Sequence, residues 1–207
     1  MPPSDSQGAA PNRPTDLGGE FGSMAFVIKS LMAKQATTTL VQVAAVSNAG
    51  GLSPVGTVDV RPMVGQIDGE GRVTPHGVIS NVPYFRLQGG ANAVILDPQV
   101  GDIGLAVFAS RDISAVKASK APGPPGSRRQ FDWADALYIG GVLNGVPSQY
   151  VRFSGDGIEL VSSTRIRGQA PAIELVSDTL THNGVNVGNT HRHGGVLPGG
   201  GTSGVPQ

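Results

Sequence analysis

One pattern occurs twice in the last third of the chain, and it constrains the fold more than any other feature. Ile-Glu-Leu-Val-Ser-x-Thr begins at Ile158 and again at Ile173, 15 residues later. A short fixed period indicates that each copy is a structural unit that cannot bury its apolar side alone. In each copy apolar residues alternate with a glutamate, Glu159 or Glu174. This alternation predicts a strand with one face in water.

The apolar face of this repeat needs a cover that the chain alone does not supply. Three identical chains wound about a common axis would bring their Ile, Leu and Val faces together and pair each strand edge with a neighbour's. A two-sheet sandwich within one chain is the alternative, but two and a half repeats provide few strands for it. We therefore expect residues 131–188 to form an intertwined, trimeric, triple-stranded β-helix.

Two histidines follow this segment with one residue between them. Steps of two from Val185 reach His191 and His193, so a continuing strand would turn both imidazoles inward and Arg192 outward. Their backbone positions would then be about 7 Å apart, at roughly 3.3 Å of rise per residue. Three chains would supply six nitrogens. An octahedral site of this kind favours iron(II), or nickel, over zinc with its usual four ligands. An isolated His-x-His, in contrast, is usually an accidental exposed pair.

Glycine dominates the chain end, which we define as an apex over residues 189–207. A closing tip has little room for side chains, and glycine allows sharp turns there. The residues assigned to this role are Gly194, Gly195, Gly199, Gly200 and Gly201, with Val196, Leu197, Val205 and Pro206 as an apolar plug.

The composition favours a mainly β protein. The 207 residues include 31 Gly and 16 Pro, and 14% are charged. Such a chain is poorly suited to long helices and well suited to short strands joined by turns. Between Thr38 and Ser119, five β-rich runs are separated by Gly, Pro and Asn. They predict a small closed barrel, most commonly of the five-stranded oligonucleotide/oligosaccharide-binding (OB) type.

One helix is expected before the barrel, over residues 20–36. Its apolar residues recur at spacings of three and four, which places them on one stripe. They are Phe21, Met24, Ala25, Ile28, Leu31 and Met32. Either the chain's own body or another chain would cover this stripe. Helix and barrel together are predicted to form a domain over residues 20–119.

The remaining segments are connecting ones. Residues 1–19 are rich in Pro, Ser, Gly and Asn and are predicted to be a flexible arm. Residues 120–130, KAPGPPGSRRQ, are predicted to be a linker that divides the protein in two. Trp133 is expected to be buried at the junction. His76 and His182 lie in turn-like sequences and are expected to be solvated loop residues.

Charge and cysteine content exclude several functions. Fifteen basic and fifteen acidic side chains give a formal charge of zero, so nucleic acid is not an expected partner. The absence of cysteine excludes disulfides and thiolate metal sites. The chain start lacks the pattern of a secretory signal, so we expect synthesis in the cytoplasm.

The tail THRHGGVLPGGGTSGVPQ resembles the C-terminal tip of central spike proteins from contractile-tailed bacteriophages. FVIKSLMAKQATTTLVQVAAV, VGTVDVRPMV and DPQVGDIGLAVFASRDIS are similar to the N-terminal barrel of that family. The resemblance implies a homotrimer made of an OB-fold barrel, an intertwined β-helix and a metal-binding apex. It also implies one iron ion per trimer, held by His191 and His193 of each subunit, and transfers a role to no other residue.

The function implied is mechanical. A virion protein at the tip of the tail baseplate, attached to baseplate hub proteins, would pierce the host outer membrane without acting as an enzyme. A metal-dependent depolymerase is one alternative, but Glu159 and Glu174 are expected on the wet side of a rod, and six nitrogen ligands leave no position for water. A glycan-binding adhesin that uses the barrel is the other alternative.

Overall fold

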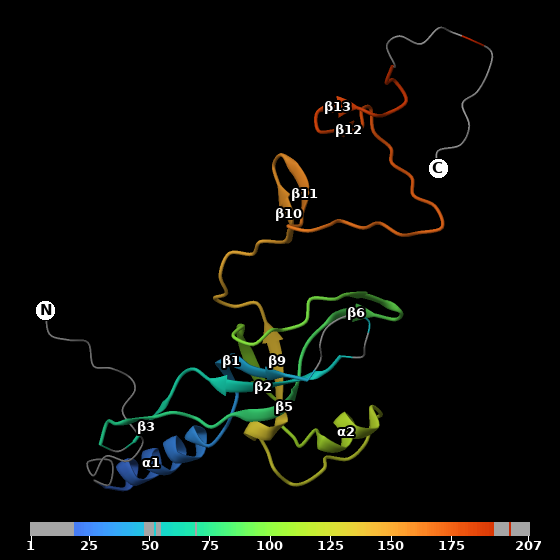
Figure 1. Cartoon of the computed structure of the whole chain (residues 1–207). Helices are drawn as coiled ribbons and strands as arrows, with labels where there is room; N and C mark the ends of the chain where they lie inside the picture. Colours follow the sequence, from blue (N-terminus) through green and yellow to red (C-terminus); the bar gives the residue numbers. More distant parts are fainter. Residues whose placement is uncertain (1–18, 48–51, 53–54, 69, 193–198, 200–207) are drawn as a thin grey trace, which may run out of the picture. The chain divides into compact units, whose positions relative to one another are not determined.

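The chain divides into two compact units, which are best taken separately (Figure 1). The computed structural model describes residues 19–47, 52, 55–68, 70–192 and 199. The N-terminal unit comprises residues 1–146 and the C-terminal unit comprises residues 147–207. Strands outnumber helices among the described residues, so the prediction of a mainly β protein is confirmed. The predicted arm lies outside the described residues, apart from Gly19.

The helix α1 (Gly19–Ala33) lies in the range where the apolar stripe predicts one. None of its residues is buried, and Phe21 is 87% exposed. The chain joins the barrel only after the helix, where Ala36 is buried and its amide donates to the carbonyl of Phe131 at 2.9 Å. The described residues therefore leave the stripe uncovered, and packing on the chain's own body is not observed.

Five strands of the N-terminal unit form one antiparallel sheet. In pairing order they are β5 (Ile79–Pro83), β2 (Thr57–Pro62), β1 (Thr38–Val46), β8 (Ile103–Phe108) and β9 (Ala136–Gly140). The edge strands also meet each other. Tyr84 and Tyr138 form a parallel bridge, and the Phe85 amide donates to the Tyr138 carbonyl at 2.9 Å. The sheet thus curls back on itself.

Three short hairpin or helical elements connect these strands. They are β3 (Gln66–Ile67) with β4 (Val73–Thr74), β6 (Leu87–Gly89) with β7 (Asn92–Val94), and the helix α2 (Ser114–Ser119). None of the residues of these elements is buried. These elements therefore lie outside the core of the curled sheet.

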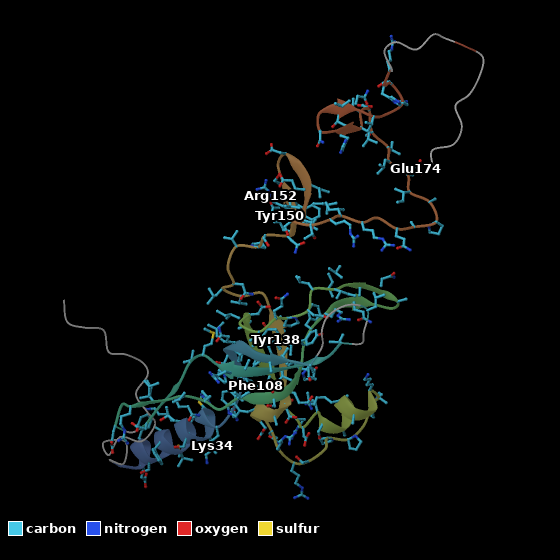
Figure 2. The ribbon with its side chains drawn as sticks, in the orientation of Figure 1. Lys34, Phe108, Tyr138, Tyr150, Arg152 and Glu174 are labelled. Atoms are coloured by element: carbon cyan, nitrogen blue, oxygen red, sulfur yellow. The ribbon has the colours of Figure 1, made fainter. Side chains whose placement is uncertain are left out.

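Alternate side chains of the sheet form a single core. Its main members are Val41, Val43, Val58, Val60, Val82, Ala106, Phe108, Ala136 and Tyr138. Figure 2 labels Phe108 and Tyr138, one from each of the last two barrel strands. A Cβ at Gly104 would lie 2.6 Å from the Tyr138 ring, so the close approach of these strands needs glycine there. Burial raises the pKa of Tyr138 to about 12.

The fifth barrel strand lies beyond the predicted linker. β9 pairs with β8 along its whole length, so the N-terminal unit continues past residues 120–130 and ends at Val146. Residues 120–130 contain no helix or strand, as their prolines and glycines require. The segment nevertheless returns to the barrel instead of leading away from it.

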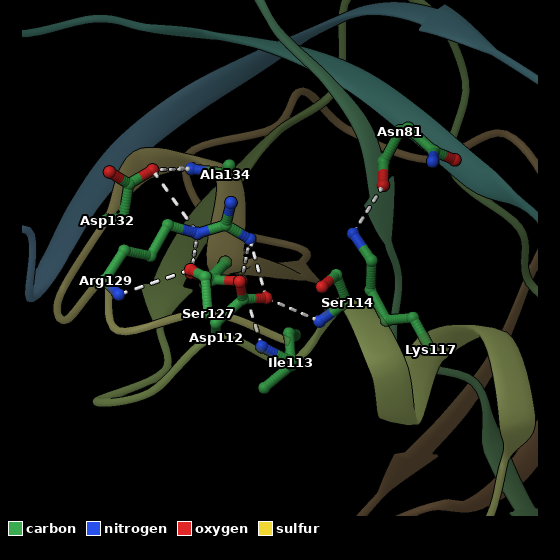
Figure 3. A network of polar contacts seen from close by, with 10 residues as sticks. Asn81, Asp112, Ile113, Ser114, Lys117, Ser127, Arg129, Asp132 and Ala134 are labelled. Carbon is green, nitrogen blue, oxygen red and sulfur yellow. Dashed lines mark hydrogen bonds and ion pairs between the residues drawn. The ribbon is translucent and has the colours of Figure 1, made fainter. Parts of the chain in front are cut away.

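Arg129 holds this returning segment in place (Figure 3). Its Nε donates to Asp135 at 2.7 Å, and its Nη2 donates to both Asp135, at 2.9 Å, and Asp112, at 2.8 Å. Both carboxylates are buried, and Asp135 is fully so. The Arg129 hydrogen bond lowers the pKa of Asp135. Hydrogen bonds from Ser114 and Ser127, followed by the charge of Arg129, lower the pKa of Asp112 to about 2.

Trp133 begins the short 3₁₀ helix η2 (Trp133–Asp135) that leads into β9. It is half-buried against the core, and its ring contacts Phe108 with centroids 4.9 Å apart. His76 stacks on the same ring at 4.6 Å and is half-buried. His76 therefore lies in a loop, as expected, but is only partly solvated, because Trp133 offers it an aromatic surface.

The C-terminal unit contains two hairpins, β10 (Tyr150–Ser154) with β11 (Gly157–Val161) and β12 (Thr181–His182) with β13 (Val185–Asn186). No described residue of this unit is buried. The first copy of the repeat forms β11, as alternation predicts. The second copy, from Ile173, forms no strand among the described residues, since it has no strand beside it to pair with.

Candidate metal centre and apolar face

The β10–β11 hairpin has one apolar face and one polar face. Residues directly opposite in an antiparallel pair share a face, and the register pairs Val151 with Leu160 and Phe153 with Ile158. All four of these side chains are exposed, Phe153 by 76%. The intervening pair, Arg152 and Glu159, forms an ion pair at 2.7 Å on the other face. The hairpin thus presents an apolar surface that none of the described residues of its own unit buries.

The β12–β13 hairpin has the same division. Its register pairs His182 with Val185 and Thr181 with Asn186. The amide of Val187 donates to the carbonyl of Leu180 at 2.8 Å, which extends the ladder by one further pair. Alternation then places four side chains on one face: Leu180, His182, Val185 and Val187. We call this set the apolar face of the second hairpin.

His182 is exposed, as its sequence predicts, but it lies in a strand and not in a loop. The turn is Asn183-Gly184, with positive φ values of 50° and 80° at the two residues, and His182 is the strand residue before it. Asn-Gly is the preferred pair for a two-residue turn of this kind. That signal could have placed His182 in a strand, because it fixes where the hairpin turns.

The strand expected to run from Val185 to His193 ends instead at Asn186. The Asn186 Oδ1 accepts from the Gly188 amide at 2.9 Å, and its Nδ2 donates to Thr190 Oγ1 at 2.7 Å. This side chain stabilises a turn where the ladder would have continued, so the predicted continuous strand is wrong as far as His191. His193 lies outside the described residues.

His191 is positioned by the turn through Gly188. Its backbone amide donates to the Gly188 carbonyl at 3.2 Å, and its Nδ1 donates to the same oxygen at 2.6 Å. Because a carbonyl can only accept, Nδ1 carries the proton and the lone pair of the neutral ring lies on Nε2. Histidines that bind metals usually donate their other ring N–H to such an acceptor. His191 therefore fits the role of a ligand through Nε2.

A concavity of about 480 Å³ connects His191 with the apolar face of the second hairpin. It is lined by Leu175, Ser177, Asp178, Leu180, Val187, Gly188, Asn189 and His191. Leu180 and Val187, two of the four residues of that face, line the concavity together with His191, whereas His182 and Val185 do not. Among the described residues, one chain assembles no group of three or more His, Asp or Glu side chains that could hold a metal.

The two glutamates of the repeat differ in their surroundings. Glu159 is bound to Arg152, whereas Glu174 is exposed and outside any strand (Figure 2). Glu159 therefore lies in a strand and Glu174 does not, although the two occupy equivalent positions in the repeat. None of the helices among the described residues has the length and apolarity to cross a bilayer.

The chain end matches a known family model. Residues 189–207, 19 of the 207, match the model described as the GpV Apex motif, which contains both His191 and His193. This motif indicates the apex of a phage tail spike and hence a virion component. A search of curated proteins finds no match to the chain.

Proposed function

We propose that this protein is the central spike of a contractile phage tail, and that it pierces the host outer membrane during infection. The observation that carries the proposal is the position of the apex motif. It lies in the C-terminal unit, in which no described residue is buried. A unit without a core among its described residues that carries a spike apex suits a needle built from several chains.

We propose a homotrimer, in which a triple-stranded β-helix is formed by residues 147–188, the part of the expected range 131–188 that lies outside the barrel unit. The support is the pair of amphipathic hairpins, whose apolar faces are left unburied by the described residues of their own unit. Isolated two-stranded hairpins are marginal in water, so these need strands from elsewhere. Winding three chains would cover the apolar faces and would give the second repeat copy strands to pair with.

We propose that the N-terminal unit is an OB-type barrel that joins the spike to hub proteins of the baseplate. Around the barrel the strands follow the order β1, β2, β5, β9 and β8, and the bridge between Tyr84 and Tyr138 joins the end of β5 to β9. In chain order these are the first, second, third, fifth and fourth strands of the sheet. This Greek-key arrangement supports the OB type. The uncovered stripe of α1 supports a contact with another protein.

We propose one metal ion per trimer at the apex, bound by His191 and His193 of all three chains. The number of ligands favours iron(II). The bond between His191 and the Gly188 carbonyl supports this assignment. Such an ion would tie three chain ends together, where fraying is otherwise cheapest. The proposed role is mechanical and not enzymatic. Bonds between chains suit it, because resistance to force depends on how many bonds must break together.

Infection by phage particles that carry this chain tests the proposal. Particles with His191→Ala and His193→Ala together should adsorb to the host as the wild type does, yet deliver their genome less efficiently. The expected reduction arises because the apex loosens while the barrel and hairpins are untouched. His76→Ala, in the barrel, is the matched control and should leave delivery unchanged.

Two results would contradict the proposed role. One is normal genome delivery by particles that lack the chain altogether. The other is a defect confined to adsorption, which would favour a glycan-binding adhesin. Release of reducing sugar from host polysaccharide by the purified chain would favour a depolymerase instead.

A further inference from the structure

We infer that His182 forms a second metal site, in which three copies of the residue bind one divalent transition-metal ion on the axis of the trimer. This inference rests on the proposed homotrimer, because one chain supplies a single ligand. Neither the apex motif, which begins at residue 189, nor the His191 and His193 assignment includes this residue.

The first step is the face on which His182 lies. It pairs directly with Val185, and Leu180 pairs with Val187 through the 2.8 Å bond between Val187 N–H and the Leu180 carbonyl. The opposite face of the same hairpin is polar, because Asn186 is engaged there with Gly188 and Thr190. His182 is thus the one polar side chain among the four of the apolar face.

The second step is the direction in which that face points. Leu180 and Val187 line the concavity that also contains His191, the residue assigned to the axial metal site. Two of the four residues on the face that carries His182 therefore line the same concavity as His191, whereas His182 and Val185 do not line it. If the three apolar faces meet at the axis, the imidazoles of His182 meet there as well.

The third step is chemical. Three imidazoles converging among Leu and Val side chains would each bring a polar nitrogen into an apolar interior, which costs free energy unless it is bonded. A metal ion satisfies all three at once. Three histidine nitrogens with one open position suit zinc, whose preferred geometry is tetrahedral. The inferred site thus differs from the apex site in ligand number and in preferred metal.

Elemental analysis of the purified full chain after equilibration with zinc, and removal of unbound ion, tests the inference. Wild type should retain one more zinc ion per trimer than His182→Ala. His182→Gln, which keeps a polar side chain of similar length, should show the same loss. His191→Ala with His193→Ala should lose the apex ion and keep the zinc at His182.

A swap variant with Thr181→His and His182→Thr provides the sharpest control. It keeps the composition but moves the imidazole to the polar face of the hairpin, so the additional zinc should be lost. Equal zinc content in wild type, His182→Ala and the swap variant would overturn the inference.

The mass of each sample separates this inference from the proposed function. A trimer without the additional zinc contradicts only the site at His182, and shows the three rings packed without an ion. A monomeric wild type contradicts the trimer and the site together.

Discussion

The two units of this protein use the same strand pattern with opposite outcomes. In the N-terminal unit, alternating residues such as Val58 and Val60 are almost completely buried. In the C-terminal unit, the equally regular Ile158 and Leu160 are more than half exposed. The difference lies in the number of neighbouring strands. Five strands can curl into a closed layer, whereas a two-stranded hairpin leaves one face open.

The comparison shows that alternation specifies a face but not its cover. A fully buried Val or Leu side chain contributes roughly 1.5–3 kcal/mol relative to an exposed one. The barrel obtains this contribution within one chain. The hairpins can obtain it only from other strands, so the stability of the C-terminal unit should depend on association.

The largest effect is expected from a charge placed in the barrel core. Val60→Asp puts an unpaired carboxylate at a fully buried position and should destabilise the N-terminal unit by more than about 4 kcal/mol. Circular dichroism during thermal unfolding measures it. Val64→Asp, at an exposed position nearby in the chain, is the control and should stay within about 0.5 kcal/mol of wild type.

A charge on the apolar face of the first hairpin should act differently. Leu160→Asp should break the association of chains while the barrel remains folded, because the barrel core lies in the other unit. Sedimentation velocity measures the change in mass. Glu159→Gln, the neighbour on the polar face, should leave association unchanged. A Leu160→Asp chain that associates as the wild type does would remove the distinction between the two units.

A smaller effect is expected from the buried ion pairs of the returning segment. Asp135→Ala removes two charge-assisted hydrogen bonds of Arg129 and should destabilise the barrel by about 1.5–3 kcal/mol, because Arg129 keeps Asp112 and is partly screened by water. Asp132→Ala, whose carboxylate lies 4.0 Å from Arg129 and is partly exposed, should cost about 1 kcal/mol or less. Equal losses in the two variants would show that Arg129 does not hold the segment. Urea unfolding provides both values.

The smallest effect is expected in the pH dependence of the barrel's stability. The pKa of Asp112 falls from 3.8 to about 2 in the folded barrel, and the pKa of Asp135 is also lowered. Lowered carboxyl pKa values stabilise the fold above pH 3.8, and this contribution is lost as the pH falls toward 2. Melting temperatures of the barrel transition should decline across that window. Asp112→Asn should flatten the decline, and an unchanged slope would contradict the assignment.

Local pattern predicted the strands better than it predicted their partners. Alternation located β11 and the first four barrel strands, and apolar spacing located α1. The fifth strand was missed because the prolines before it indicated a boundary, whereas Arg129 ties that segment back to Asp112 and Asp135. The strand toward His191 was overextended because nothing in the alternation signals that Asn186 stabilises a turn.

The metal site at the chain end stays a prediction. The His-x-His pair and the glycines lie within the apex motif, so their grouping was visible in the sequence. The contact between His191 and the Gly188 carbonyl depends on the turn and was not visible. The face on which His182 lies depends on the register of β12 and β13. In the sequence, only the Asn183-Gly184 turn indicates that register.

The mass of the full chain in solution tests the central claim most directly, because the C-terminal unit is held to be incomplete in one copy. Sedimentation equilibrium at low protein concentration should give three times the chain mass of 21.1 kDa. A single-chain mass, with the C-terminal hairpins protected from hydrogen exchange, would contradict the account.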